Sequence, residues 1–292
     1  MKIAVLMATF NRVAVTVRGL EAFFASARRQ ELAVFEIFLL DDASPDGTAA
    51  TVRATFPEIH VLDGTGNLWW NRGMCAAYRA ARQSGIAFDA YLLLNDDVIL
   101  KPEALGDLVE TFTALNRQAP AALTGSMCGP DQRPSYPGLS RNPAHRPLRR
   151  PMAPKLLMQV IPDGSVQRCD TFHANCVLVP AGPMEAVGGL DPRFRHWHGD
   201  TDLGFMLGRQ GCAAYVMPDY VGECALNGPL PIAPTVAGRL KARLSPPNSI
   251  FDELNMVFKR YPLPVAIGNG ALRIAYLFRD ALRPRKPPPA RK

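Results

Sequence analysis

Residues 89–97 have the sequence DAYLLLNDD, in which a continuous apolar run ends in two adjacent carboxylates. A run of this kind is typical of a strand that is buried on both faces of a sheet. Asn95, Asp96 and Asp97 follow the run, so we expect them at the carboxyl end of that strand. Ligands of open α/β sheets bind at that edge, which makes these acids candidates for function.

Other apolar runs alternate with helical patterns along the rest of the chain. We expect further strands over residues 3–9, 35–42, 58–63, 121–129, 165–172, 174–181 and 212–219. Helical spacing covers residues 13–29, 45–56, 72–85, 101–118, 183–189, 203–211, 249–261 and 266–282, and the last two segments are amphipathic. Alternation of buried strands with helices predicts an α/β protein whose parallel sheet is covered on both sides.

The composition is that of a soluble globular protein, with 48% hydrophobic and 20% charged residues among 292. No run reaches the roughly 18 apolar residues that a membrane-spanning helix needs. The first residues, MKIAVLMATFNR, lack the small-residue cleavage site of a signal peptide, so we expect a buried strand there. Six cysteines without a CxxC pair indicate reduced thiols in a cytoplasmic protein and give no support for a zinc site.

The net charge of +7 is concentrated at one end of the chain. Residues 1–233 carry 21 Lys and Arg against 23 Asp and Glu, whereas residues 234–292 carry 12 against 3. Such asymmetry indicates an anionic partner, either a membrane surface, a nucleic acid or a polyphosphate. For the final RPRKPPPARK (residues 283–292), a solvated and disordered tail is the alternative.

Asp96 and Asp97 repel each other unless a positive group lies beside them. A divalent cation meets that need, since Mg²⁺ or Mn²⁺ takes one or two carboxylates together with substrate phosphates. A solvated pair in a surface loop is the alternative, because a short acidic motif alone does not distinguish the two.

Asp41 and Asp42 also end an apolar run. Ser44 or Asp46 can cap the helix expected after them, which explains one polar residue but not two acids at a strand end. One of the two acids can accept a hydrogen bond from a nucleobase N–H.

Residues 66–73, with the sequence GNLWWNRG, are unusual for a loop. Two consecutive indoles point in different directions, so either Trp69 or Trp70 is expected to line a pocket while the other packs in the core. Gly73 is expected to begin a helix whose first amides receive phosphate, with Arg72 adding positive charge.

Residues 196–202, with the sequence HWHGDTD, place acids and aromatic rings directly before a helical pattern. Asp200 or Asp202 can simply cap that helix. A carboxylate at the edge of a pocket is also what a general base requires, and burial by Trp197 would raise its pKa. The two histidines lack the spacing of a zinc site.

Taken together, five motifs resemble the inverting family 2 glycosyltransferases. They are ATFNR (8–12), LDDASPDGT (40–48), GNLWW (66–70), NDDV (95–98) and GDTDL (199–203), and the resemblance covers about residues 1–225. It implies the GT-A fold, which joins a Rossmann-like nucleotide-binding half to an acceptor-binding half across a mixed central sheet. The chain would then comprise a catalytic domain over residues 1–233, divided near residue 100, and a basic helical extension over 234–292.

The resemblance also implies roles for individual residues on the donor side. Ala8 and Phe10 would contact the base, Asp42 would bind its N3–H, and Asp96 would contact the ribose or sugar. Asp97 would ligate Mg²⁺ or Mn²⁺ at the donor diphosphate. The remaining donor-side candidates are Arg12, Asn67, Trp69, Trp70 and Arg72.

On the acceptor side, the resemblance implies that Asp200 is the general base and deprotonates the acceptor hydroxyl. Trp197, His198 and Asp202 would surround the acceptor or support the base. Two departures affect this part of the chain. Met206 stands where many relatives have an arginine, with Arg209 one turn further on, and GECA (222–225) replaces a metal-binding histidine, so that Glu223 or Cys224 would have to take its place.

For the whole protein, the resemblance implies a bacterial enzyme of surface-polysaccharide synthesis, similar to rhamnosyl- or galactofuranosyltransferases. The donor would be a UDP-sugar or dTDP-sugar, and the acceptor a glycan or a lipid-diphosphate-linked sugar. The enzyme would be cytoplasmic and peripheral at the inner face of the membrane, with its basic C-terminus on anionic lipid. The proline-rich basic loop 130–155 could close over phosphates.

Other function classes fit the sequence less well. A sugar-phosphate nucleotidyltransferase needs a glycine-rich loop with Arg and Lys after the first strand, where this chain has ATFNR. No GxGxxG follows that strand, which disfavours a dehydrogenase. A nucleic-acid binder would leave the acidic motifs unexplained. A non-catalytic nucleotide-sugar-binding protein remains the main alternative.

Overall fold

The computed structural model describes residues 1–144, 157–228, 233–247 and 249–282. Residues 145–155 of the predicted loop 130–155 and the terminal segment 283–292 lie outside these residues. The expectations for both segments therefore stay predictions.

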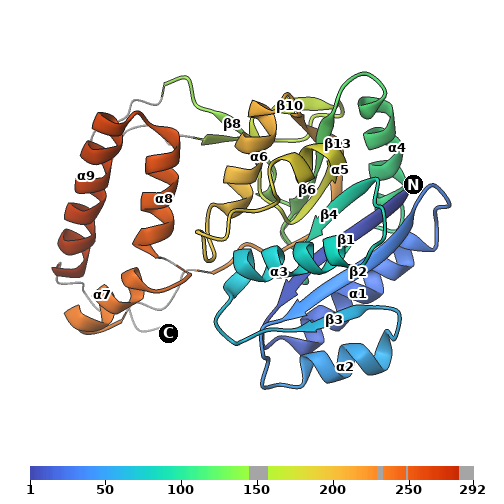
Figure 1. Cartoon of the computed structure of the whole chain (residues 1–292), viewed down its shortest axis with the longest axis horizontal. Helices are drawn as coiled ribbons and strands as arrows, with labels where there is room; N and C mark the ends of the chain where they lie inside the picture. Colours follow the sequence, from blue (N-terminus) through green and yellow to red (C-terminus); the bar gives the residue numbers. More distant parts are fainter. Residues whose placement is uncertain (145–156, 229–232, 248, 283–292) are drawn as a thin grey trace.

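A mixed sheet of ten strands forms the centre of the described protein (Figure 1), in the order β10-β13-β6-β12-β4-β1-β2-β3, with β5 and β7 paired at its margins. Its strands are β1 (Lys2–Thr9), β2 (Val34–Asp41), β3 (His60–Asp63), β4 (Ala90–Leu94), β5 (Ile99–Leu100), β6 (Ala121–Cys128), β7 (Pro134–Tyr136), β10 (Gln167–Cys169), β12 (Cys176–Pro180) and β13 (Ala213–Glu223). A smaller sheet joins β8 (Gly138–Arg141), β9 (Leu157–Val160) and β11 (Thr171–Phe172).

Nine helices lie in the described residues. They are α1 (Val13–Ala27), α2 (Thr48–Thr55), α3 (Trp69–Gln83), α4 (Ala104–Asn116), α5 (Ala181–Ala186), α6 (Gly199–Arg209), α7 (Val236–Leu244), α8 (Ile250–Arg260) and α9 (Leu263–Leu282). Figure 1 shows α8 and α9 side by side at one end of the molecule, away from α2. Among the described residues, none of the helices is long and apolar enough to cross a membrane.

The parallel half of the sheet sets the position of the site. Strand β1 pairs in parallel with β2 on one side and with β4 on the other. The chain thus moves outward through β2 and β3 and then returns to the opposite side of β1 to form β4. A reversal of strand order opens a crevice at the carboxyl ends of the two strands that flank it, here β1 and β4.

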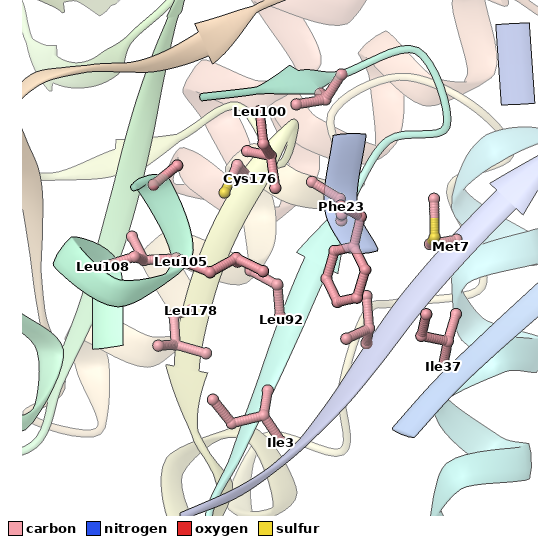
Figure 2. Packing of buried hydrophobic residues seen from close by; sticks show 14 of the residues in the cluster. Ile3, Met7, Phe23, Ile37, Leu92, Leu100, Leu105, Leu108, Cys176 and Leu178 are labelled. Atoms are coloured by element: carbon pink, nitrogen blue, oxygen red, sulfur yellow. The ribbon is translucent and has the colours of Figure 1, made fainter. Parts of the chain in front are cut away.

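The core lies on both faces of this sheet. Ile3, Val5 and Met7 point to the face covered by α1 and α4, where Phe23 and Leu105 pack against them in one cluster (Figure 2). The intervening side chains of β1 join a second cluster with Met74 and Tyr78 of α3 and residues of β12. The alternation follows from the two-residue period of a strand, and it explains why the predicted strands are apolar at every position.

The predicted α/β class and the mixed sheet are confirmed, but several element boundaries differ. Helix α3 begins at Trp69 rather than at residue 72, and α6 begins at Gly199. The predicted strand over 165–172 is divided, so that β10 joins the large sheet and β11 the small one. Strands β5, β7, β8 and β9 and helix α7 were not predicted, because the strands have only two to four residues and α7 only nine.

One glycine allows α1 to approach the acidic loop. A Cβ at Gly19 would collide with the backbone carbonyl of Asp96, whereas a Cβ at Gly208 of α6 would meet nothing within 4 Å. We expect Gly19→Ala to lower the free energy of unfolding by about 1–3 kcal/mol, since the backbone must shift. The matched change Gly208→Ala should be neutral or stabilising by up to about 1 kcal/mol. Urea unfolding of both variants measures the difference, and equal effects would contradict it.

Candidate functional site

A large cavity lies at the carboxyl ends of β1 and β4, with a volume of about 1240 Å³. Residues from the ends of both strands line it, together with the loop before α3, the segment before α6 and the helices α8 and α9. The predicted site residues on its wall are Ala8, Phe10, Arg12, Asp42, Trp69, Trp70, Asp96, Asp97, Trp197, His198 and Asp200. Five others, Asn67, Arg72, Asp202, Glu223 and Cys224, are not part of the wall.

Arg12 supplies the positive charge beside the acid pair. Its Nη1 lies 3.3 Å from Oδ1 of Asp96 and 3.0 Å from Oδ2 of Asp97. Asp96 is only 4% exposed, and this burial raises its pKa to about 6 despite Arg12. Thr16 donates a hydrogen bond of 3.0 Å to its other oxygen. Asp97 keeps 24% of its side chain exposed and is thus the more accessible carboxylate of the pair.

Cys224 contacts Asp97 from the end of β13. Its thiol lies 3.4 Å from Oδ1 of Asp97, and Asn175 donates to its sulfur at 3.3 Å. Burial is the largest cause that raises the pKa of this thiol, and the charge of Asp97 is the next. Cys224 is therefore protonated and donates its hydrogen to Asp97. Glu223 instead accepts a hydrogen bond from Gln132, away from the cavity. Neither Glu223 nor Cys224 is part of the cavity wall, and their role as replacement ligands stays a prediction.

Asp42 organises the loop before α3. Its carboxylate accepts hydrogen bonds from the backbone amides of Gly66, Leu68 and Trp69, at 2.8–3.0 Å. These bonds hold Trp69 at φ +61°, a left-handed conformation that costs free energy for a bulky residue. Because a carboxylate can accept about four hydrogen bonds, Asp42 retains capacity for one further donor from the cavity.

The two consecutive tryptophans make different contacts. Nε1 of Trp70 donates a 2.7 Å hydrogen bond to the side chain of Asn95, which ties α3 to the acidic loop. Trp69 is partly exposed and packs edge-on against His196 across the cavity wall. Both indoles line the cavity, and Trp70 also packs against the second core cluster, as expected for one of the two.

The predicted phosphate site at Gly73 is not formed. Helix α3 starts four residues earlier, so Gly73 lies in its second turn, where a Cβ would crowd Ala8 and Leu40. Nε of Arg72 donates to the carbonyl of Pro192 and turns away from the cavity. Asn67 accepts from the indole of Trp69 and also lies outside the wall.

Asp200 lies in the first turn of α6. Its oxygens accept hydrogen bonds from the amides of Thr201 and Ala174, at 2.6 and 3.1 Å. Nδ1 of His173 is 3.8 Å from Oδ2, and 16% of the Asp200 side chain is exposed. Burial opposes ionisation, but His173 and the two amides outweigh it and hold the pKa of Asp200 below its usual range. Burial thus acts in the predicted direction, but the predicted net rise of the Asp200 pKa is wrong.

His198 precedes α6 with φ +71° and faces the same cavity. Burial lowers the pKa of His198 and outweighs the neighbouring carboxylates, so its imidazole is neutral at pH 7. Trp197 beside it is 50% exposed. The pair thus offers an apolar plane and an uncharged hydrogen-bonding ring, which suits a neutral ligand such as a sugar.

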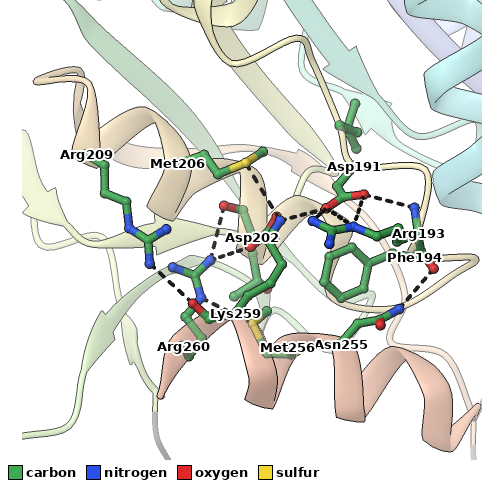
Figure 3. Close-up of polar contacts among 12 residues, drawn as sticks. Asp191, Arg193, Phe194, Asp202, Met206, Arg209, Asn255, Met256, Lys259 and Arg260 are labelled. Carbon is green, nitrogen blue, oxygen red and sulfur yellow. Dashed lines mark hydrogen bonds and ion pairs between the residues drawn. The ribbon is translucent and has the colours of Figure 1, made fainter. Parts of the chain in front are cut away.

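Asp202 does not line the cavity, so of its two predicted places, near the acceptor or in support of the base, the first is corrected. It is fully buried and forms ion pairs with Lys259 and Arg260 of α8 (Figure 3). Met206, noted above for replacing an arginine, lies with its sulfur 3.8 Å from Nζ of Lys259. Positive charge at this point of α6 is thus supplied by a helix more than fifty residues further along the chain.

The structure adds wall residues that the sequence did not single out. His173 stands beside Asp200, and Tyr136 and Asn175 lie near Asp97 and Cys224. Glu253, Met256 and Arg273 come from α8 and α9. No local motif marks these positions, because they reach the cavity only through strand pairing and helix packing. The one available signal was His173, a histidine directly before the predicted strand 174–181.

The comparisons with known proteins agree with this geometry. The model of glycosyl transferase family 2 matches residues 4–172, which is more than half of the chain. The chain belongs to glycosyl transferase family 2. It is a glycosyltransferase, as predicted, which removes the nucleotidyltransferase and the dehydrogenase as alternatives.

Curated relatives of this family 2 glycosyltransferase include an N-acetylglucosaminyl-diphospho-decaprenol L-rhamnosyltransferase of Mycobacterium tuberculosis. It is 24% identical over 216 residues, which span 68% of this chain and 69% of the relative. Among solved structures, the mannosyltransferase PcManGT from Pyrobaculum calidifontis, in complex with GDP-Man and Mn²⁺, is similar with a TM-score of 0.52 at 16% identity, covering 96% of this chain and 72% of that one.

TarS of S. aureus (residues 1–349) is similar with a TM-score of 0.55 at 13% identity, over 96% of this chain and 71% of that chain. At such identities the likeness concerns the fold alone. Together with the mixed sheet, these neighbours confirm the predicted GT-A fold.

All three tryptophans of the chain, Trp69, Trp70 and Trp197, line the cavity. We therefore expect intrinsic fluorescence to change when UDP or dTDP enters, with Mn²⁺ present, because filling the cavity alters the solvent around each indole. Trp197→Phe and Trp69→Phe should each remove part of the change. A thermal shift on addition of the nucleotide without any change in emission would place the nucleotide elsewhere.

Proposed function

We propose that the enzyme transfers a sugar, with inversion, from a nucleoside-diphosphate sugar to a hydroxyl group of a lipid-diphosphate-linked or glycan acceptor. The observation that carries this proposal is the presence of Asp97 and Asp200 on the wall of one cavity. Each keeps part of its side chain exposed, whereas Asp42, Asp96 and Asp202 are almost fully buried.

The donor would bind at the carboxyl ends of β1 and β4. Phe10 is exposed at the cavity and offers a ring for the base, beside Ala8. The remaining acceptor capacity of Asp42 suits the N3–H that uracil and thymine share, which supports a UDP-sugar or dTDP-sugar. Arg12 would contact the donor from its position beside Asp96 and Asp97.

The acid pair fits a divalent cation whose coordination the substrate completes. The described residues contain no group of three or more His, Cys, Asp and Glu that could hold a metal by themselves. Mg²⁺ and Mn²⁺ nevertheless bind with one or two carboxylates and donor phosphates, and Asp97 is the accessible carboxylate. Bound there, such a cation would supply positive charge that stabilises the departing nucleoside diphosphate.

Asp200 would act as the general base. Its low pKa keeps it ionised at neutral pH, ready to accept the proton of the acceptor hydroxyl. The hydroxyl oxygen then forms a bond to the anomeric carbon as the bond to the donor phosphate breaks, and the proton stays on the carboxylate. His173, 3.8 Å away, stabilises the ionised form before the transfer. A single displacement of this kind inverts the anomeric configuration.

The acceptor would lie against Trp197 and His198. The curated relative, by its name, acts on a diphosphate-linked decaprenol carrying N-acetylglucosamine and transfers L-rhamnose. By this likeness we extend the proposal to a polyprenyl-diphosphate-linked acceptor. The exposed indole of Trp197 suits the apolar face of an acceptor sugar.

A lipid-linked acceptor would place the enzyme at a membrane, through the extension that we assign to residues 234–292. Helix α9 carries an exposed stripe that is entirely apolar, made of Ile267, Ala271, Ile274, Ala275, Phe278 and Leu282. The extension holds 12 Lys and Arg against 3 Asp and Glu. Apolar burial together with about 1 kcal/mol for each basic residue near anionic lipid would hold the enzyme at the inner membrane face.

Replacing the base should separate binding from transfer. We expect Asp200→Asn to lower transfer by at least about 100-fold, because the amide cannot take the proton, while UDP still binds with Mn²⁺ present. The assay uses dTDP- and UDP-sugars with a polyprenyl-diphosphate-linked N-acetylglucosamine, and calorimetry measures UDP binding. Asp219→Asn, an exposed position of β13, is the control for the same substitution. Turnover retained by Asp200→Asn would leave the enzyme without its proposed base.

Removing the apolar stripe should weaken membrane binding. We expect the combined changes Ile267→Ser, Ile274→Ser and Phe278→Ser to reduce sedimentation with vesicles rich in phosphatidylglycerol. Binding of the unchanged protein should fall with rising salt and be weak on neutral phosphatidylcholine. Equal binding of the variant and the unchanged protein would contradict a role of the stripe in membrane binding.

A further inference from the structure

Helix α8 faces the site with charged and amide side chains as well as apolar ones, since Ile250, Met256 and Val257 are buried together with Asp252. Asp252, Asn255, Met256, Lys259 and Arg260 recur at the three- and four-residue spacing of one helix face, and each contacts residues 191–202 or lines the cavity. The exposed aromatic residues of the same helix are Phe251 and Phe258. Buried charged side chains need specific partners, so the polar residues of this face, unlike its apolar ones, determine how α8 packs on the site.

At the first turn of α8, Asp252 binds a loop of the site. It is 1% exposed, and its carboxylate accepts hydrogen bonds from the amides of Arg195, His196 and Trp197, at 3.0–3.1 Å. Three consecutive amides aimed at one buried carboxylate fix the path of the backbone, because the charge is stable only when all its donors are in place.

At the last turn of α8, Lys259 and Arg260 bind the other side of the same segment (Figure 3). Nζ of Lys259 pairs with Asp191 at 2.7 Å and also with Asp202. Nη2 of Arg260 lies 2.7 Å from the other oxygen of Asp202. Between the two ends of the helix, Asn255 donates to the carbonyl of Arg193 at 3.1 Å.

Asp200 lies between these anchors, with residue 197 fixed on one side and residue 202 on the other. We propose that α8 is a positioning element of the active site and that Asp252 is a positioning residue for Asp200, Trp197 and His198. None of the hydrogen bonds or ion pairs described for α8 involves Asp200 itself. The inference rests on the proposed role of Asp200 as base, and it makes the extension part of the catalytic unit rather than only a membrane anchor.

The test is Asp252→Asn in the full chain. Asparagine keeps the size of the side chain but replaces one acceptor oxygen with an NH2 donor. This donor would face the backbone amides that the carboxylate binds, and two donors cannot pair. We expect kcat to fall roughly 100-fold, as a small misplacement of reacting groups can cause, while the Kd for UDP with Mn²⁺ stays within about twofold. Hydrogen exchange should become faster over residues 191–202 and stay unchanged over residues 89–97.

Two controls separate positioning from a loss of stability. Asp280→Asn makes the same substitution at an exposed residue of α9 and should leave kcat unchanged. Leu277→Ala removes buried apolar contacts from α9 and should lower Tm with little effect on kcat. If Leu277→Ala at an equal loss of Tm lowers kcat as much as Asp252→Asn does, the positioning role is overturned.

The remaining outcomes distinguish the positioning role of Asp252 from the proposed role of Asp200 as base. Unchanged kcat in Asp252→Asn overturns the inference, even if Asp200→Asn is inactive and the proposed function holds. Conversely, an active Asp200→Asn removes the proposed base, while a fall in kcat in Asp252→Asn would still assign a positioning role toward Trp197 and His198. If Asp252→Asn does not fold, Asn255→Leu tests the same anchor and should lower kcat without changing the Kd for UDP.

Discussion

The site depends on one constraint, which is that a carboxylate withdrawn from water must be given hydrogen-bond donors or positive charge. Four buried acids meet it in different ways. Asp42 takes three amides of the loop before α3, Asp252 takes three amides before α6, Asp96 takes Arg12 and Thr16, and Asp202 takes Lys259 and Arg260. These hydrogen bonds and ion pairs hold segments in and around the cavity wall in place, so the buried carboxylates have a structural role.

This use of charge distinguishes the acids that hold the wall from those that remain open to a ligand. Asp97 and Asp200 each keep part of the side chain exposed at the cavity, Asp97 beside Arg12 and Asp200 beside His173. The division also explains why α8 belongs with the site. Its charged face meets the segment that carries Asp200, while its exposed phenylalanines and the stripe of α9 are left for another surface.

Much of the fold and part of the candidate site were predictable from the sequence, and the incorrect residue placements share one cause. Apolar runs ending in acids gave the parallel strands and the placement of Asp97, since both follow from local pattern. The assignments of Arg72 and Asp202 failed because their partners, Pro192 and the pair Lys259 and Arg260, lie far along the chain. The amphipathic pattern of α8 was recognised, but periodicity alone does not say which face is buried.

The central claim is that Asp200 activates the acceptor for one direct displacement at a donor held near Asp97. The most direct measurement is the anomeric configuration of the transferred sugar, determined by NMR on the product of a single turnover. The account predicts inversion relative to the nucleotide sugar. Retention would require either two successive displacements from opposite faces of the sugar or attack from the face that the leaving group departs from, and either would contradict the assignment of Asp200 as the general base of a single displacement.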